Sequence, residues 1–87
     1  MPGPSLRIDR LLFFLRLAKS RTLAQGWAEQ EHIRINGIRV EKGSFAVRVG
    51  DVMTLPGGDD VLTVKLLALP SRRGPPGEAR SCYQLLK

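Results

Sequence analysis

The stretch HIRINGIRV, residues 32–40, carries the clearest local structural signal in the chain. Apolar and polar residues alternate on both sides of Asn36-Gly37, a dipeptide that favours the type I′ turn of a two-residue β-hairpin. This register pairs the apolar residues on one side, namely Ile33 with Val40 and Ile35 with Ile38. Arg34 then lies opposite Arg39 on the other side. The sequence therefore predicts a hairpin with one apolar and one cationic face.

The cationic face of this hairpin has two interpretations. Like charges directly opposite each other destabilise a strand pair slightly, and an anion held between Arg34 and Arg39 would offset that repulsion. Lys42 adds a further cation to the same neighbourhood. The alternative is that both arginines point into water and are screened by salt. The hairpin alone leaves both interpretations open.

A helix is predicted upstream of the hairpin. Its apolar residues recur at i, i+3, i+4 and i+7, the pattern of a helix with one buried stripe, and they are Ile8, Leu11, Leu12 and Leu15. Phe13 and Leu17 project away from that stripe, so another segment should pack on them. The segment after Pro70 supplies apolar residues for this role, and the alternative is a free basic tail.

The polar stretch SRTLAQ, which begins at Ser20, marks the start of a second helix that runs to about Glu31. The hydroxyl of Ser20 or Thr22 can accept an N–H of the first turn. The residues expected to be buried are Leu23, Ala24, Trp27 and Ala28. An ordinary cap explains Ser20 but not the cations Lys19 and Arg21 beside it. The stretch therefore favours a phosphate site at the half-positive helix end.

Downstream of the hairpin, VRVGDVMTL and VLTVKLLAL predict further strands, with turns at Gly50-Asp51 and in PGGDD, residues 56–60. The inward residues of the last strand are expected to be Leu62, Val64, Leu66 and Ala68. After Pro70 a basic, proline-rich linker precedes EARSCYQLLK, which predicts a short closing helix. We expect an α+β chain with a flexible leader at 1–5, one domain at 6–69 and a basic C-terminal extension at 70–87.

Charge is the unusual feature of the composition. The 87 residues include 14 Lys+Arg and 8 Asp+Glu, a formal net charge of +6 that is concentrated in residues 7–42 and 70–87. This balance favours a polyanion as partner: RNA, DNA or an anionic membrane. No stretch has the length of a signal peptide's apolar region or of a membrane span, so we expect a cytoplasmic protein without a membrane partner.

Catalytic and metal chemistry have little support in the sequence. Cys82 is the one cysteine and His32 the one histidine, which excludes an internal disulfide and leaves no metal-ligand spacing. His32 has no neighbouring nucleophile or carboxylate spaced like a catalytic relay, and no glycine-rich phosphate loop is present. We therefore expect no enzymatic activity, no cofactor and no small-molecule substrate.

Several of these stretches, in this order, resemble the S4-type RNA-binding domain. They are RIDRLLFFLRLAKSRTLAQ, HIRINGIRV, Lys42 and VRVGD, and together they span about residues 7–55. The resemblance implies two antiparallel N-terminal helices, the αL motif, packed on a small bent antiparallel sheet. The later stretch LALPSRRGPPGEARSCY is similar to the segment that follows this domain in the bacterial, ribosome-associated heat shock protein 15 family. That similarity implies a non-enzymatic protein that binds ribosomal RNA of the large subunit, together with peptidyl-tRNA, in ribosome recycling under stress.

The resemblance also implies which residues contact RNA: Arg7, Lys19, Ser20, Arg21, Gln25, Arg34, Asn36, Arg39 and Lys42. It gives Asp9 a structural role as acceptor for the start of the second helix. Family members usually have glycine where this chain has Glu31, so a less suitable residue makes the left-handed turn after that helix. Two other functions stay open, a protein-interaction module and a helix-turn-helix-like DNA binder, although the arginine-bearing hairpin argues against simple major-groove binding.

Overall fold

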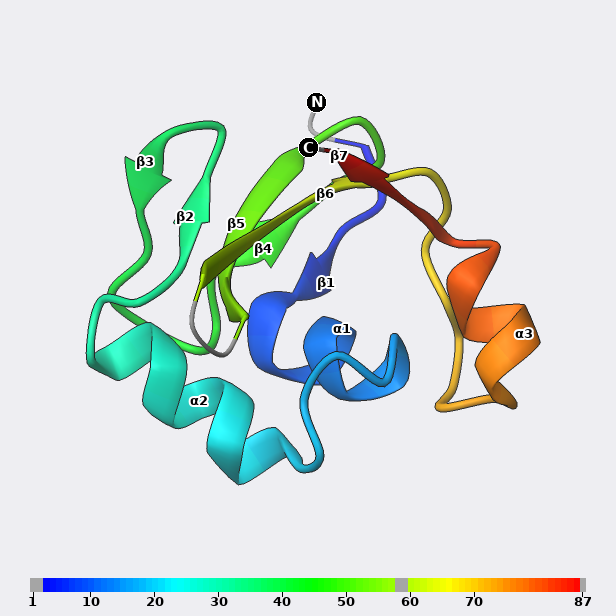
Figure 1. Ribbon diagram of the computed structural model, residues 1–87, viewed down its shortest axis with the longest axis horizontal. Helices are drawn as coiled ribbons and strands as arrows, with labels where there is room; N and C mark the ends of the chain where they lie inside the picture. Colours follow the sequence, from blue (N-terminus) through cyan, green and yellow to red (C-terminus); the bar gives the residue numbers. More distant parts are fainter. Residues whose placement is uncertain (1–2, 58–59, 87) are drawn as a thin grey trace.

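The computed structural model describes residues 3–57 and 60–86, and over these ranges the chain forms three helices and two antiparallel sheets (Figure 1). The elements are β1 (Leu6–Arg7), α1 (Ile8–Phe14), α2 (Arg21–Glu29), β2 (Arg34–Ile35), β3 (Ile38–Arg39), β4 (Ala46–Val47), β5 (Val52–Gly57), β6 (Asp60–Leu66), α3 (Pro76–Arg80) and β7 (Tyr83–Leu86). Strand β1 pairs with β4, and the larger sheet has the order β3-β2-β5-β6-β7. This arrangement confirms the α+β class and the two N-terminal helices on an antiparallel sheet.

The core lies between the two N-terminal helices and the larger sheet. All four residues of the predicted stripe on α1 are buried, as are Ala24 and Ala28 on α2. The predicted burial of Leu23 is wrong, because 41% of this residue is exposed. The contact between α1 and α2 uses small alanines, which allow the two helices to approach closely, and Leu23 lies outside it. In Figure 1 both helices lie on one side of the larger sheet, with the β2–β3 hairpin and α3 at opposite ends.

Both N-terminal helices end in the same way, at a residue other than glycine in the left-handed conformation. After α1, Arg16 has φ 62°, and the N–H of Leu17 donates to the carbonyl of Leu12 at 3.0 Å. After α2, Glu31 has φ 63°, and the N–H of His32 donates to Trp27 at 2.9 Å. These are Schellman motifs, which satisfy the last carbonyls of a helix. The expected left-handed turn at Glu31 is confirmed, and α2 ends at Glu29.

The hairpin has the predicted register. Arg34 pairs with Arg39 and Ile35 with Ile38, and the turn residues Asn36 and Gly37 have φ values of 53° and 81°. Two positive φ values in succession define the type I′ turn. The apolar side of the hairpin is only partly covered, since Ile38 is 65% exposed. Its strand, β3, is the edge of the sheet, and that position leaves Ile38 outside the core.

The C-terminal segment differs from the prediction of a closing helix. Helix α3 ends at Arg80, and the following residues form β7, which pairs with β6 from Thr63 to Leu66. A strand here satisfies backbone groups of β6 that would otherwise lie on an open sheet edge. Ala68, expected inside, is exposed because β6 ends at Leu66. The predicted turn at 56–60 includes Gly58 and Asp59, and the leader includes Met1 and Pro2; these four residues lie outside the described part of the chain.

Candidate nucleic-acid interface

The start of α2 is built as the sequence predicts. Ser20 is the N-cap in an extended conformation, and its hydroxyl oxygen accepts the N–H of Leu23 at 3.0 Å. Lys19 and Arg21 are exposed on either side of it. The first turn of α2 therefore presents its free N–H groups between two exposed cations, an arrangement that suits a phosphate group.

Lys42 is held beside both N-terminal helices by the residue that follows it. The N–H of Asp9 donates to the carbonyl of Gly43 at 3.1 Å, so the loop after Lys42 provides an acceptor for the first turn of α1. Gly43 is buried, and a Cβ there would lie 3.1 Å from Oδ2 of Asp9 and 3.2 Å from Cγ of Gln25. This close packing brings Lys42 next to Gln25 on α2 and the start of α1.

The buried carboxylate of Asp9 is a structural acceptor, but its partners differ from the predicted ones. Arg7 donates to it twice, from Nε to Oδ1 and from Nη2 to Oδ2, both at 2.9 Å. The N–H of Arg10 donates to Oδ1 at 2.6 Å. Asp9 therefore stabilises the start of α1, and the expectation that it serves the start of α2 is wrong. Arg7 is oriented by a bidentate pair, which is among the stronger polar contacts in proteins.

The two arginines of the hairpin have a neighbour that the sequence analysis missed. Nη1 of Arg39 lies 2.8 Å from Oε1 of Glu31, with the two side chains 57% and 46% exposed. The carboxylate thus sits beside the paired arginines and offsets their repulsion. Glu31 reaches Arg39 because the left-handed turn after α2 directs the chain toward the hairpin. A polar cleft of about 500 Å³ lies here, lined by Glu31, Arg34, Gly37, Arg39 and Glu41.

The side-chain amide of Asn36 forms hydrogen bonds within the protein. Its Nδ2 donates to Oδ1 of Asp51 at 3.0 Å, and its Oδ1 accepts the N–H of Val52 at 2.9 Å. These bonds join the tip of the hairpin to the turn before β5. Gln25 is also engaged, since its Nε2 donates to Oε2 of Glu29 one helical turn later at 3.0 Å. An RNA contact by Asn36 or Gln25 stays a prediction.

Most of the predicted residues lie on α2 or on the segments next to its two ends. Lys19, Ser20 and Arg21 stand at the start of α2, and the Glu31–Arg39 pair joins its far end to the hairpin. In Figure 1 the β2–β3 hairpin lies beyond this far end of α2. Helix α2 has nine residues, so these ends are about 13 Å apart at 1.5 Å per residue. We call the following exposed residues together the basic surface: Lys19, Ser20, Arg21, Gln25, Arg34, Arg39 and Lys42. Arg7 lies next to it on β1.

The C-terminal extension folds back onto the core as expected, with Ala79 and Cys82 buried and Tyr83 packed against the core. Arginine contacts on the end of α1, which the sequence does not predict, add to this packing. Nη1 of Arg73 donates to the carbonyl of Phe13 at 2.6 Å, and its guanidinium carbon lies 4.4 Å from the centre of the Phe13 ring. Nε of Arg16 donates to the carbonyl of Gly74 at 2.6 Å. Arg72 pairs with Glu78 at 3.0 Å. A cation on a ring face and a donor at a helix C-terminus are both favourable, but nothing local in the sequence links residues so far apart.

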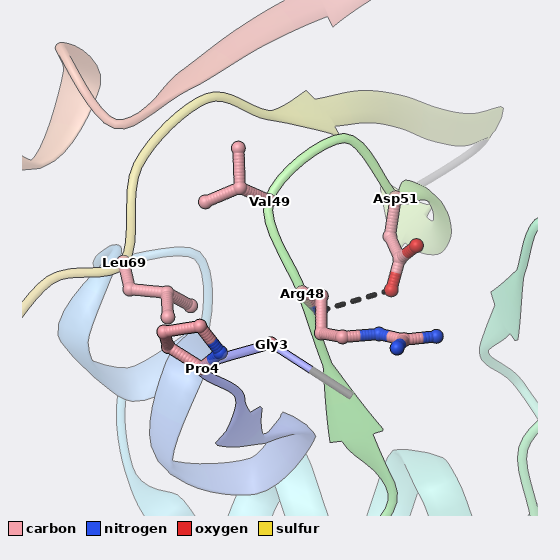
Figure 2. A pocket seen from close by; sticks show the side chains of 6 residues that line it. All are labelled: Gly3, Pro4, Arg48, Val49, Asp51 and Leu69. Carbon is pink, nitrogen blue, oxygen red and sulfur yellow. Dashed lines mark hydrogen bonds between the residues drawn. The ribbon is translucent and has the colours of Figure 1, made fainter. Parts of the chain in front are cut away.

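A second cavity, of about 450 Å³, is lined by none of the predicted residues (Figure 2). Pro4, Val49 and Leu69 form its apolar part, while Arg48 and Asp51 line its polar part. The carboxylate of Asp51 accepts the backbone N–H of Arg48 at 2.9 Å (Figure 2). That bond shapes the turn between β4 and β5 and brings no pair of reactive side chains together.

The described residues offer neither a metal-binding cluster nor a membrane-spanning helix. Among residues 3–57 and 60–86, no three His, Cys, Asp or Glu side chains are grouped so that they could hold a metal ion. Within the same ranges, no helix has the length and apolar character needed to cross a membrane.

Comparison with known proteins identifies the family. The S4 domain model matches residues 6–53, which include all nine predicted RNA contacts. The RQC P-site tRNA stabilizing factor of Bacillus subtilis is 38% identical over 82 residues, covering 94% of this chain and 93% of that protein. Heat shock protein 15 of Escherichia coli K12 is 34% identical over 95% of this chain, which spans only 62% of that relative's length. The trimeric structure of heat shock protein 15 from Vibrio cholerae superposes with a TM-score of 0.88 and 30% identity, over 95% of this chain and 83% of that one. The chain belongs to the S4-domain family.

Proposed function

We propose that this chain binds RNA through the basic surface. The observation that carries the proposal is the placement of exposed cations at both ends of α2 and beside its middle, at the start of α2, on the hairpin and at Lys42. Several cations spread along one side contact successive phosphates of an RNA backbone, and a capped helix N-terminus offers N–H donors to one more. Membership of the S4-domain family supports RNA over other polyanions.

The RNA that we propose is ribosomal RNA of the large subunit, bound together with peptidyl-tRNA. Support comes from the relatives' names: one is a P-site tRNA stabilizing factor and matches nearly end to end, and others are heat shock protein 15. The protein would act in the cytoplasm by holding stalled or released subunits during rescue under stress. We propose no catalytic step, no small-molecule substrate and no membrane partner for it.

Co-sedimentation with purified ribosomal subunits tests this function. The intact chain should sediment with the large subunit, more so when peptidyl-tRNA is bound. The double variant Lys19→Ala, Arg21→Ala should remain in the supernatant at a salt concentration where the intact chain is bound. Its matched control is Lys65→Ala, Arg80→Ala, which removes the same charge from exposed positions on β6 and α3.

Two results would overturn the proposal. One is an intact chain that does not sediment with subunits at any moderate salt concentration. The other is a Lys19→Ala, Arg21→Ala variant that sediments as well as its control. Competition by duplex DNA as strong as that by ribosomal RNA would instead support the DNA-binding alternative.

A further inference from the structure

The C-terminal extension contacts one carbonyl at the end of α1 and one in the connection that follows this helix. Nη1 of Arg73 donates to the carbonyl of Phe13 at 2.6 Å and lies 3.3 Å from the carbonyl oxygen of Ala18. The same guanidinium stacks on the Phe13 ring. In the reverse direction, Arg16 donates to the carbonyl of Gly74. Figure 1 shows the segment that leads to α3 beside the end of α1.

These contacts fix the direction in which Arg73 points. Carbonyls at the C-terminal end of a helix carry partial negative charge and lack partners within the helix. A guanidinium that donates to the carbonyl of Phe13 and to that of Ala18, and that also covers a ring face, has its donors directed into the protein. Arg73 is half-buried, whereas the side chain of the preceding Arg72 is 66% exposed and pairs with Glu78. The two neighbouring arginines therefore have different surroundings.

The carbonyl that Arg73 contacts belongs to the connection between α1 and α2. Ala18 is followed directly by Lys19 and the N-cap Ser20. The N–H groups of Leu17 and Ala18 both donate to the carbonyl of Leu12, at 3.0 and 3.1 Å, which ties the beginning of the connection to α1. Arg73 contacts the carbonyl of Ala18 in the same connection. The path of the chain into Lys19 and Ser20 thus depends on a residue more than fifty positions later.

We propose that Arg73 is a positioning residue for RNA binding: it holds the α1–α2 connection in the shape that presents Lys19 and Ser20, without touching RNA itself. The inference rests on the proposed function, because it concerns the same basic surface. The C-terminal extension would then order the α1–α2 connection before RNA binds, so that binding does not have to supply the free energy of ordering it.

Titration of the full-length chain with deproteinised large-subunit ribosomal RNA, at several salt concentrations, tests this role. Arg73→Ala should weaken binding roughly tenfold, because ordering the loop then opposes binding. The slope of log affinity against log salt should stay as in the intact chain, since no phosphate contact is lost. Arg72→Ala, which removes the same charge one residue away, should keep its affinity within about twofold. Arg73→Lys retains the charge and a donor and should recover part of the loss.

Amide hydrogen exchange supplies the readout that is local to the loop. Exchange at Leu17 and Ala18, whose N–H groups are hydrogen-bonded, should be faster in Arg73→Ala than in the intact chain and unchanged in Arg72→Ala. Val64→Ala, which leaves a cavity in the buried part of β6, serves as the control for a general loss of stability. It should lower the melting temperature without changing RNA affinity at a temperature where the chain is folded. If Arg73→Ala does not fold, Phe13→Leu removes the stacking face while leaving every charge in place.

The outcomes separate this inference from the proposed function. If Arg21→Ala weakens binding but Arg73→Ala binds like Arg72→Ala, the positioning role is wrong and the RNA surface stands. A salt slope that falls by about one unit in Arg73→Ala would also overturn it, since Arg73 would then contact a phosphate directly. If Arg21→Ala has no effect either, the proposed function itself fails.

Discussion

Two residues in the left-handed conformation, Arg16 and Glu31, illustrate how this chain uses side chains where glycine would be easier. A residue other than glycine in that conformation costs on the order of 1–2 kcal/mol. Each of these residues places a charged side chain against another part of the fold: Arg16 on the carbonyl of Gly74, and Glu31 on Arg39. Glycine would form the same backbone turn but could not make either contact.

Replacing Glu31 distinguishes the energetic cost of its left-handed backbone from the contribution of its ion pair with Arg39. Glu31→Gly removes the strain of a left-handed residue that has a side chain, and it loses an exposed ion pair that contributes about 0–1 kcal/mol. The free energy of unfolding of this variant should therefore equal or exceed that of the intact chain. Glu31→Ala loses the ion pair but keeps the backbone strain, so it should be less stable than Glu31→Gly by about 1 kcal/mol. Urea denaturation measures both variants. Equal stability of the glycine and alanine variants would contradict a left-handed backbone at this position.

Asn36 shows how one residue type can suggest a function while having a structural role. The resemblance makes it an RNA contact, but its amide bonds Asp51 and Val52. Asn36→Gly keeps a backbone that tolerates positive φ and removes only these side-chain bonds. The variant should lose about 1–3 kcal/mol of stability, at roughly 0.5–1.5 kcal/mol for each of the two hydrogen bonds, as measured by urea denaturation. A variant as stable as the intact chain would show that both bonds are dispensable.

At the scale of elements, the sequence predicts those features whose cause is local. The helical stripe of α1, the Ser20 cap and the type I′ turn each follow from residues within about one turn of chain, whereas the left-handed Glu31 is implied by the family resemblance. Strand β7 could not be predicted in this way, because the reason that Tyr83–Leu86 forms a strand is the open edge of β6. The exposure of Ile38 likewise depends on β3 being the last strand of its sheet. The division into a domain at 6–69 and an extension at 70–87 stays a prediction.

Removing the extension tests its contribution to the fold. A chain truncated after Pro70 loses β7, α3 and the Arg73 contacts on α1, and it exposes the edge of β6. Its melting temperature should fall by more than about 8 °C, given a shift of roughly 4–8 °C per kcal/mol for a domain of this size. A dye that binds exposed apolar surface should fluoresce more strongly with the truncated chain. An unchanged melting curve would show that the extension adds nothing to stability.

For the molecule as a whole, the charge pattern is more specific than the net charge of +6 indicates. Arg72 and Arg73 of the extension pair with a carboxylate and with helix carbonyls, so they add little to a cationic face. Arg7 is bound to Asp9, and Arg39 to Glu31. The exposed cations at the start of α2, together with Arg34 and Lys42, therefore carry most of the proposed attraction for RNA. The sequence predicts this site through cap chemistry and family resemblance, but it could not predict the partners of the arginines, which lie far along the chain.

The central claim is that Lys19 and Arg21 contact phosphates at the start of α2. The most direct measurement is the salt dependence of binding to ribosomal RNA by the intact chain and by Lys19→Ala, Arg21→Ala. Two lost phosphate contacts should lower the slope of log affinity against log salt by about 1.4–1.8. The melting temperature should stay unchanged, because both side chains are exposed. A slope equal to that of the intact chain would contradict the account.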